Sequence, residues 1–311
     1  MTSFNKVALT AEEQLNLLIS RGLVVEDYKS AVNVLKQIGY YHLSAYMRNF
    51  QRGINHEFIA NTNFKDVIDL YNFDEELRLI SFNAIRKIEI AYRAAISNVM
   101  CKKYNSHWFY DVNAFKNNTY IKKCENLILS EIVNKKGVYA ATFIAKYYQK
   151  YNNPALPPFW MSVETFTLGA IATLYQMISS KNQREITQYL GFTTDNKIVS
   201  QSNWLYAITV VRNTSAHNAR LYNKVFRITP TINRHIKELQ INSNITTNSY
   251  YYIAMIINYY LKTISNDISF ENDIQKLFAK YPQIDKTKMG FPANWNGFTI
   301  TNISKQKVSS N

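Results

Sequence analysis

Three residue types that can act on a phosphodiester lie close together at Arg212, Asn213 and His217 of this 311-residue chain. An arginine stays charged and presents a planar fork of donors that matches phosphate oxygens. A histidine imidazole exchanges protons near neutral pH and can act as a general acid or base. An asparagine can orient the imidazole or donate a hydrogen bond to an oxyanion. The group as a whole suits the cleavage of a phosphodiester.

The chemistry that fits these residues best is the cleavage of RNA. The 2′-hydroxyl of RNA attacks the adjacent phosphate when a base removes its proton and a cation stabilises the phosphorane. This reaction requires no metal, and DNA, which lacks the 2′-hydroxyl, cannot be cut by it. No other cluster of carboxylates, thiols or histidines of comparable quality occurs in the sequence. We therefore expect no metal site and no cofactor.

Positive charge is concentrated around this segment. The chain carries a net charge of +14, of which +6 lies in residues 101–150 and +5 in residues 201–250. No Asp or Glu occurs between Asp195 and Glu238. Such a field attracts anions, and it makes a nucleic acid a reasonable partner. We expect Arg220, Lys224 and Arg227 to contribute to RNA binding.

A purely structural role for the same residues stays open. In a chain of this composition, an arginine followed at such a spacing by a histidine arises by chance in about half of cases. Under this alternative, His217 caps or hydrogen-bonds within a helix pair, and Arg212 closes a salt bridge.

Helices must position these residues, because the chain has only 8 Gly and 6 Pro and its apolar residues recur at three and four positions. Thr10 and Glu13 form a capping-box pattern at the start of the first helix. We expect further helices at about 28–38, 40–50, 64–100, 120–134, 139–150, 161–179, 182–190, 202–219, 231–239, 248–265 and 270–280. The proline-rich stretch 152–158 is the one clear break.

A helix over 202–219 places the candidate residues on different faces. Trp204, Ile208 and Val211 form its buried stripe, whereas Asn213, His217 and Arg220 fall on the opposite face. Arg212 lies toward the edge of the core. Its stem must pack there, and its guanidinium must curl around to reach His217.

The remaining features indicate one all-α protein that stays in the cytoplasm. We expect an N-terminal helical extension over 1–60, a core over 61–266 and a C-terminal extension over 267–311. The N-terminus lacks the apolar run of a signal peptide, and no apolar stretch is long enough to span a bilayer. Cys101 and Cys124 have no ligand-like spacing, and we expect both thiols to be reduced.

Other polar groups have less specific patterns. We expect ordinary structural roles for the remaining histidines, a solvated helix face rather than a metal cluster for 74–76, and intrahelical ion pairing for Glu89. Lysine pairs at 102–103 and 122–123, with neighbouring aromatic residues, suggest either an RNA-binding surface or aromatic rings packed beneath lysines.

Several ordered segments of the chain resemble the Abi-like family, the AbiD/AbiF type of bacteriophage abortive-infection proteins. RNTSAHNARLYN at 212–223 resembles that family's RN-x-x-AH-x-x-RL-[WY]-N signature. The other matching segments, in chain order, are QIGYYHLSAY at 37–46, LYNFDEELR at 70–78, RKIEIAYR at 86–93, PFWMSVE at 158–164 and MGFPANW at 289–295.

The resemblance implies a HEPN-like helical bundle with additional N-terminal and C-terminal helices. The R-x4–6-H motif of HEPN proteins marks metal-independent ribonucleases, and it assigns Arg212 and His217 as the catalytic pair with Asn213 beside them. Such an enzyme acts as an RNA-cleaving toxin and leaves 2′,3′-cyclic phosphate and 5′-hydroxyl ends. Because this chain has a single such motif, a homodimer through the Arg212–His217 face is expected. A small antitoxin RNA is a further implied partner.

Two other classes of function stay open on the residues alone. One is a non-catalytic RNA-binding module of a defence or toxin–antitoxin system, and the other is a protein-interaction scaffold.

Overall fold

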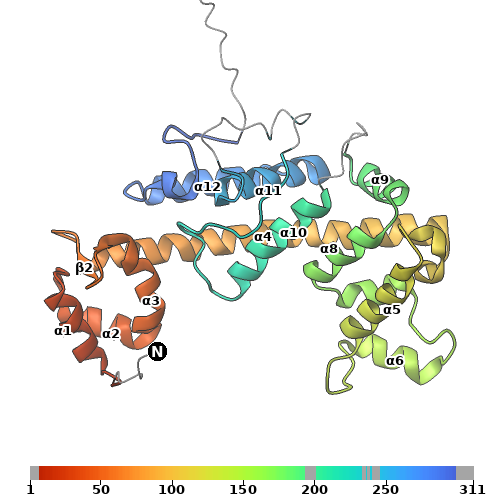
Figure 1. Ribbon diagram of the computed structural model, residues 1–311, viewed down its shortest axis with the longest axis horizontal. Coiled ribbons are helices and arrows are strands. Elements are labelled where there is room, and N and C mark those ends of the chain that lie inside the picture. Colours follow the sequence, from red (N-terminus) through yellow and green to blue (C-terminus); the bar gives the residue numbers. More distant parts are fainter. Residues whose placement is uncertain (1–6, 193–200, 233–235, 237–238, 240–245, 299–311) are drawn as a thin grey trace, which may run out of the picture.

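The computed structural model describes residues 7–192, 201–232, 236, 239 and 246–298. The predicted all-α class is confirmed, because helices form nearly all of the regular structure in these residues. The axis of the molecule is the single long helix α4 (Phe64–Lys103), along which the other elements are arranged (Figure 1).

The helix α4 is defined at its start by a reciprocal cap. The Asn63 side chain accepts a hydrogen bond from the Lys65 N–H, and the Asp66 carboxylate accepts one from the Asn63 N–H. At 40 residues, α4 is about 60 Å long. Nine core positions are expected from its helical period, and six of them are buried, namely Val67, Leu70, Leu77, Ile85, Ile88 and Ala95. The other three, Tyr71, Ile80 and Ala91, are partly buried and pack against the core. One helix therefore supplies core surface to every other part of the fold.

A small N-terminal lobe covers the first end of α4. It consists of α1 (Ala11–Ser20), α2 (Tyr28–Ile38), α3 (Tyr40–Met47), η1 (Arg48–Phe50) and the hairpin of β1 (Gln51–Arg52) and β2 (Glu57–Phe58). The predicted Thr10–Glu13 capping box is present. Gly39, with φ +86, turns the chain between α2 and α3, a conformation that favours glycine. The hairpin, which pairs Gln51 with Phe58, was not predicted, since each strand has only two residues.

A second lobe surrounds the other end of α4 (Figure 1). It contains η2 (Trp108–Tyr110), η3 (Val112–Ala114), α5 (Thr119–Ile132), α6 (Thr142–Lys150), α7 (Phe159–Ser162), η4 (Val163–Thr165), α8 (Leu168–Met177) and α9 (Ser180–Tyr189). The proline-rich break separates α6 from α7, as predicted. The prediction of one helix over 161–179 is wrong, because the chain is extended at Phe166 and a new helix begins at Leu168. Thr167 caps this helix by accepting a hydrogen bond from the Ala170 N–H.

Three helices complete the middle of the molecule, namely α10 (Gln201–Ala216), α11 (Tyr250–Ser265) and α12 (Ser269–Lys280), followed by η7 (Lys286–Met289). Each of the three packs on α4. The helix predicted at 231–239 lies largely outside the described residues, and residues 231–232 are not helical. Within the described part of the chain, no helix combines the length and apolarity needed to cross a membrane.

An ion pair connects the junction of α11 and α12 to α4, and its contribution to stability should depend on pH. Lys87 Nζ lies 2.6 Å from Asp267 Oδ2, and the Ser269 N–H donates to the same carboxylate. Hydrogen bonds from Lys87 and Ser269 lower the pKa of Asp267 to about 2. A carboxyl whose pKa is depressed in the folded state stabilises the fold above its unfolded pKa, and this contribution is lost as the pH falls through the folded value.

Asp267→Asn is therefore expected to lower the free energy of unfolding at pH 7 by about 1 kcal/mol or less, because Lys87 is half exposed. The difference between variant and parent should shrink between about pH 4 and pH 2, measured by urea denaturation. The matched control is Asp273→Asn, whose carboxylate is 4.0 Å from an exposed lysine. A constant difference across this pH range would contradict the assignment.

Candidate functional site

The helix α10 carries Arg212 and Asn213 and is held by the apolar stripe that its sequence predicts. Trp204, Ile208 and Val211 are buried. The Trp204 indole N–H donates to the Thr231 carbonyl at 2.7 Å, which ties the helix to the chain that follows it. The side chain of Asn213 is exposed on the opposite side. This part of the helix-wheel prediction is confirmed.

The predicted end of this helix at residue 219 is wrong, because α10 ends at Ala216. Asn218 adopts a left-handed conformation with φ +54. Its N–H donates to the Ser215 carbonyl at 3.1 Å, and the Ala219 N–H donates to the Thr214 carbonyl at 2.9 Å. This pair of bonds is a Schellman motif, in which asparagine takes the position usually held by glycine. The chain therefore leaves the helix at His217.

His217 and Arg220 consequently do not occupy the wheel positions that a longer helix gives them. The His217 N–H still donates to the Asn213 carbonyl at 3.0 Å, so the histidine lies one turn from the asparagine. The imidazole is exposed, and it has no hydrogen-bond or ion-pair partner in the part of the chain that the structure describes. It is accessible to a ligand or to another copy of the chain.

Arg212 lies at the edge of the core, as predicted, with its side chain 27% exposed. Its guanidinium carbon lies 5.5 Å from the centre of the Phe82 ring, and its Nε is 3.7 Å from Glu89 Oε2. Its Nη1 donates to the Asn213 side-chain oxygen at 3.4 Å. The prediction that the guanidinium reaches His217 is not met within this chain. Phe82 and Glu89 hold it over α4 instead.

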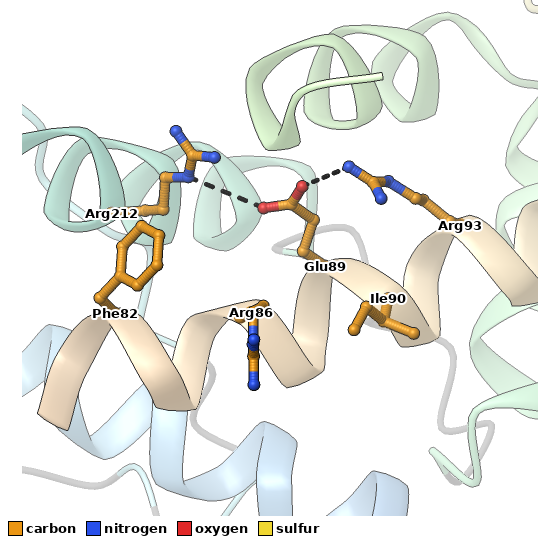
Figure 2. Close-up of a pocket in the computed structure, with 6 residues that line it drawn as sticks. All are labelled: Phe82, Arg86, Glu89, Ile90, Arg93 and Arg212. Carbon is orange, nitrogen blue, oxygen red and sulfur yellow. Dashed lines mark hydrogen bonds and ion pairs between the residues drawn. The ribbon is translucent and has the colours of Figure 1, made fainter. Parts of the chain in front are cut away.

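The guanidinium of Arg212 forms one wall of a pocket of about 240 Å³ between α10 and α4 (Figure 2). The lining residues are Phe82, Arg86, Glu89, Ile90, Arg93 and Arg212. The guanidinium groups of Arg93 and Arg212 face the Glu89 carboxylate, whereas the Arg86 side chain points away from it (Figure 2). Three arginines and one carboxylate line the pocket, so its lining carries a net positive charge. Arginine forks match the oxygens of a phosphate, so the pocket suits a phosphate group of a nucleic acid.

Glu89 is the centre of this arrangement. Its carboxylate is almost completely buried and pairs with Arg93 at 2.5 Å on one side and Arg212 on the other. Arg93 also donates to the Phe166 carbonyl, and its Nε is a buried donor with no partner among the described residues. A buried carboxylate between two guanidinium groups fixes the position of both.

The predicted intrahelical ion pairing of Glu89 is confirmed for Arg93, and among the described residues no ion pair joins Glu89 to Arg86. The sequence predicted this pairing and the resemblance of 86–93, but it did not indicate that Glu89 and Arg93 belong to the candidate site. A second signal is that Glu89 adjoins the core position Ile88 on α4, where a carboxylate needs a cationic partner.

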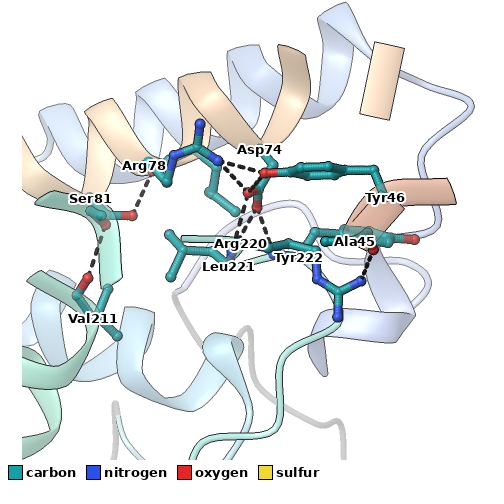
Figure 3. A network of polar contacts seen from close by, with 11 residues as sticks. Ala45, Tyr46, Asp74, Arg78, Ser81, Val211, Arg220, Leu221 and Tyr222 are labelled. Atoms are coloured by element: carbon teal, nitrogen blue, oxygen red, sulfur yellow. Dashed lines mark hydrogen bonds and ion pairs between the residues drawn. The ribbon is translucent and has the colours of Figure 1, made fainter. Parts of the chain in front are cut away.

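The chain that follows His217 is fastened to a buried network around Asp74 (Figure 3). The Asp74 side chain is 0% exposed and accepts hydrogen bonds from the Leu221 N–H at 3.1 Å and the Tyr222 N–H at 2.6 Å. Arg78 and the Tyr46 hydroxyl donate to the same carboxylate at 2.6 Å and 2.8 Å. Leu221 and Tyr222, which follow His217 in the sequence, are therefore held between α3 and α4.

This network corrects the prediction of a solvated helix face at 74–76. Asp74 lies four residues after Leu70 and three before Leu77, which places it on the buried stripe of α4. Glu76 accepts hydrogen bonds from Lys280 and Tyr281 of the C-terminal region. No group of three or more potential metal ligands occurs in the described residues.

The three candidate RNA-binding residues occupy different environments in the segment after α10. Arg220 donates to the Ala45 carbonyl of α3, and Lys224 donates to the Thr214 hydroxyl at 3.1 Å. Burial, with a smaller contribution from Arg220, lowers the pKa of Lys224 below its ordinary value. Arg227 is exposed. Of the three, Arg220 lies against α3, and Lys224 lies against α10.

Other predicted candidates have structural partners. The His42 ring packs against Tyr71 with 5.8 Å between centroids, and the His107 ring nitrogens lie 2.9 Å from Ser106 Oγ and 3.1 Å from the Leu156 carbonyl. His235 lies outside the described residues. In the second lobe, Lys103 and Lys122 pair with carboxylates, and Trp108 is fully buried against Phe115 and Phe159. The aromatic rings there pack in the core.

Comparison with known proteins gives one match. The family model described as Abi-like protein matches residues 33–223, which include α3, the pocket on α4 and the segment that ends at Asn223. No curated protein and no solved structure matches the chain.

Proposed function

Because the chain belongs to the family of Abi-like proteins, whose name indicates a role in abortive infection by bacteriophage, we propose that it is a metal-independent endoribonuclease of the HEPN type. In this role it cuts RNA as a toxin of the defence response. The observation that carries the proposal is the position of Arg212. Its guanidinium is held by Glu89 in a cationic pocket, next to the exposed Asn213 and five residues before the exposed His217 in the sequence.

The proposed reaction is an internal transfer on RNA. An imidazole of His217 takes the proton of the 2′-hydroxyl while the 2′-oxygen attacks phosphorus, and the bond from phosphorus to the 5′-oxygen breaks. A second imidazole acts as the general acid and gives a proton to the departing 5′-oxygen. Arg212 stabilises the charge on the phosphorane, and Asn213 orients the imidazole or the phosphate. The products are 2′,3′-cyclic phosphate and 5′-hydroxyl ends.

A homodimer supplies the second imidazole in this proposal. Tyr206 lies seven residues before Asn213 on the same face of α10, and its ring is half exposed. On α4, Ile90 beside the pocket is 56% exposed. Exposed apolar side chains next to exposed polar ones are typical of a surface that pairs with another chain. A second copy on this face would bring the two His217 side chains to one phosphate.

A non-catalytic RNA-binding module is the second candidate, and one observation favours it. Arg212 contacts Glu89 and Asn213 rather than His217, so a single chain holds a phosphate-binding group without a general base in contact with it.

Cleavage of RNA without metal tests the proposal. Purified full-length protein is incubated with total RNA in EDTA, and the RNA ends are analysed for 2′,3′-cyclic phosphate and 5′-hydroxyl groups. We expect the cleavage of RNA to continue in EDTA. A DNA substrate should stay intact, because DNA has no 2′-hydroxyl to attack the phosphate. RNA retention without cleavage would favour the binding module, and absence of both would favour a protein-interaction scaffold.

A further inference from the structure

Two stretches of chain that contain no acidic residue meet beside the candidate active site. One is 28–56, which includes α3 and the start of the hairpin, and the other is 201–232, which includes α10 and the segment after it. They lie far apart in the sequence. The Asp74 network and the contacts of Arg220 bring them together (Figure 3).

The contacts between these stretches are specific. The Arg220 guanidinium donates to the Ala45 carbonyl of α3, and the Asn223 amide donates to the Asn49 side-chain oxygen at 3.0 Å. The residues between Arg220 and Asn223 are Leu221 and Tyr222, and their N–H groups donate hydrogen bonds to the Asp74 carboxylate. Residues 220–223 are therefore fixed beside the C-terminal end of α3, and Arg220 contacts the backbone of that helix.

The exposed stripe of α3 carries an aromatic ring and a cation. Tyr41 and Ala45 of α3 are four residues apart, and Arg48, which caps the end of α3 in a helical conformation, follows three residues later. This spacing places the three residues on one side of the helix. Tyr41 is 90% exposed, and among the described residues no hydrogen bond or ring contact involves its side chain. Arg48 is exposed and has no carboxylate within ion-pair distance in the described ranges. Neither side chain contributes visibly to the stability of the fold.

We propose that Tyr41, Arg48 and Arg220, here called the α3 tract, bind single-stranded RNA beside the cleavage site. The inference rests on the proposed function, because it assigns the α3 tract to the substrate. Exposed aromatic rings between cations bind single strands by stacking on bases while the cations contact the phosphates. The ring of Tyr41 stacks on one base, and the arginines hold the backbone of the strand that extends from the scissile phosphate.

Charge complementarity selects RNA over a protein partner. All of the formal charge in both stretches is positive, and Arg220 of the α3 tract lies three residues after His217 in the sequence. An acidic protein would also match this charge, but it would make no use of a fully exposed aromatic ring next to a phosphate site.

Binding of a non-cleavable strand tests the α3 tract. The probe is a 2′-O-methyl RNA of about 12 nucleotides with a fluorescent label, and its anisotropy is measured with full-length protein in EDTA at several salt concentrations. Tyr41→Ala is expected to weaken binding about tenfold. Arg48→Gln is expected to reduce the slope of log affinity against log salt by about 0.7, the value for one phosphate contact on a single strand.

The controls are an exposed tyrosine and a lysine from the second lobe. Tyr189→Ala removes a ring that is 58% exposed on α9, and Lys135→Gln removes an exposed cation. Both should bind as the parent does. If Tyr41→Ala and Arg48→Gln bind the probe as tightly as the parent does, the proposal that the α3 tract binds RNA is wrong, even if the protein cuts RNA. Weakened binding in a protein that cuts no RNA would support the α3 tract and refute the nuclease.

Discussion

His217→Ala is expected to reduce the rate of RNA cleavage by about a thousandfold, because general acid–base catalysis contributes a factor on the order of 10² to 10⁴. The side chain is exposed and has no partner in the described part of the chain, so its removal should leave the fold unchanged. Initial rates on a labelled single-stranded RNA in EDTA measure the effect. An equal melting temperature for variant and parent confirms that the loss is chemical.

Arg212→Ala is expected to cause a loss of similar size by removing the cation that stabilises the phosphorane. Glu89 keeps its partner Arg93 in this variant, so the ion pair on α4 survives. Arg212→Lys keeps the charge but lacks the planar fork, and it should recover only part of the rate. The double variant should lose little more than the single ones, since the two groups act on the same step.

The matched control for these variants is Arg184→Ala, which removes an exposed arginine of α9 outside the pocket. It should cut RNA at the parental rate. Full activity of either His217→Ala or Arg212→Ala would refute the assignment of the catalytic pair.

The largest effect on stability is expected at Asp74. Asp74→Ala should lower the free energy of unfolding by about 3–5 kcal/mol, because it leaves the buried guanidinium of Arg78 without its counter-charge. The Tyr46 hydroxyl and the N–H groups of Leu221 and Tyr222 also lose their acceptor. Urea denaturation measures the change, with equal m-values as the sign that the unfolded state is not altered.

Glu75→Ala is the control for this prediction, because Glu75 is the exposed neighbour of Asp74 on α4. It should change the free energy of unfolding by no more than about 0.5 kcal/mol. Asp74→Asn keeps an acceptor oxygen in the same place and should lose less than Asp74→Ala. Parental stability of Asp74→Ala would show that the network does not hold the segment after His217.

The regular elements were largely predictable, because local signals decide where a helix begins and ends. The Thr10 capping box, the stop at Gly39 and the long stripe of α4 all follow from spacing and capping. The errors arose where the local signal is weak. The bend at Phe166 contains neither glycine nor proline, and the end of α10 depends on an asparagine in a left-handed conformation.

The candidate site was predictable only in part. The motif identified Arg212, Asn213 and His217, and the helical period placed Asn213 on the exposed face and the Arg212 stem at the edge of the core. The period could not reveal that Glu89 and Arg93 of another helix hold the Arg212 guanidinium. Contacts between α4 and α10 depend on how two helices cross, which no local pattern records.

By itself, the sequence determined the helical class, most helix boundaries and the residue types that suit phosphodiester chemistry. Spacing, capping and composition act within a few residues, so they can be read from the chain. Only the tertiary structure decided which of the buried charges are partners. In the folded chain, Asp74 accepts hydrogen bonds from residues 221–222, and Arg212 pairs with Glu89 rather than contacting His217. Buried charges must find partners wherever packing brings them, and that choice is made by the whole fold.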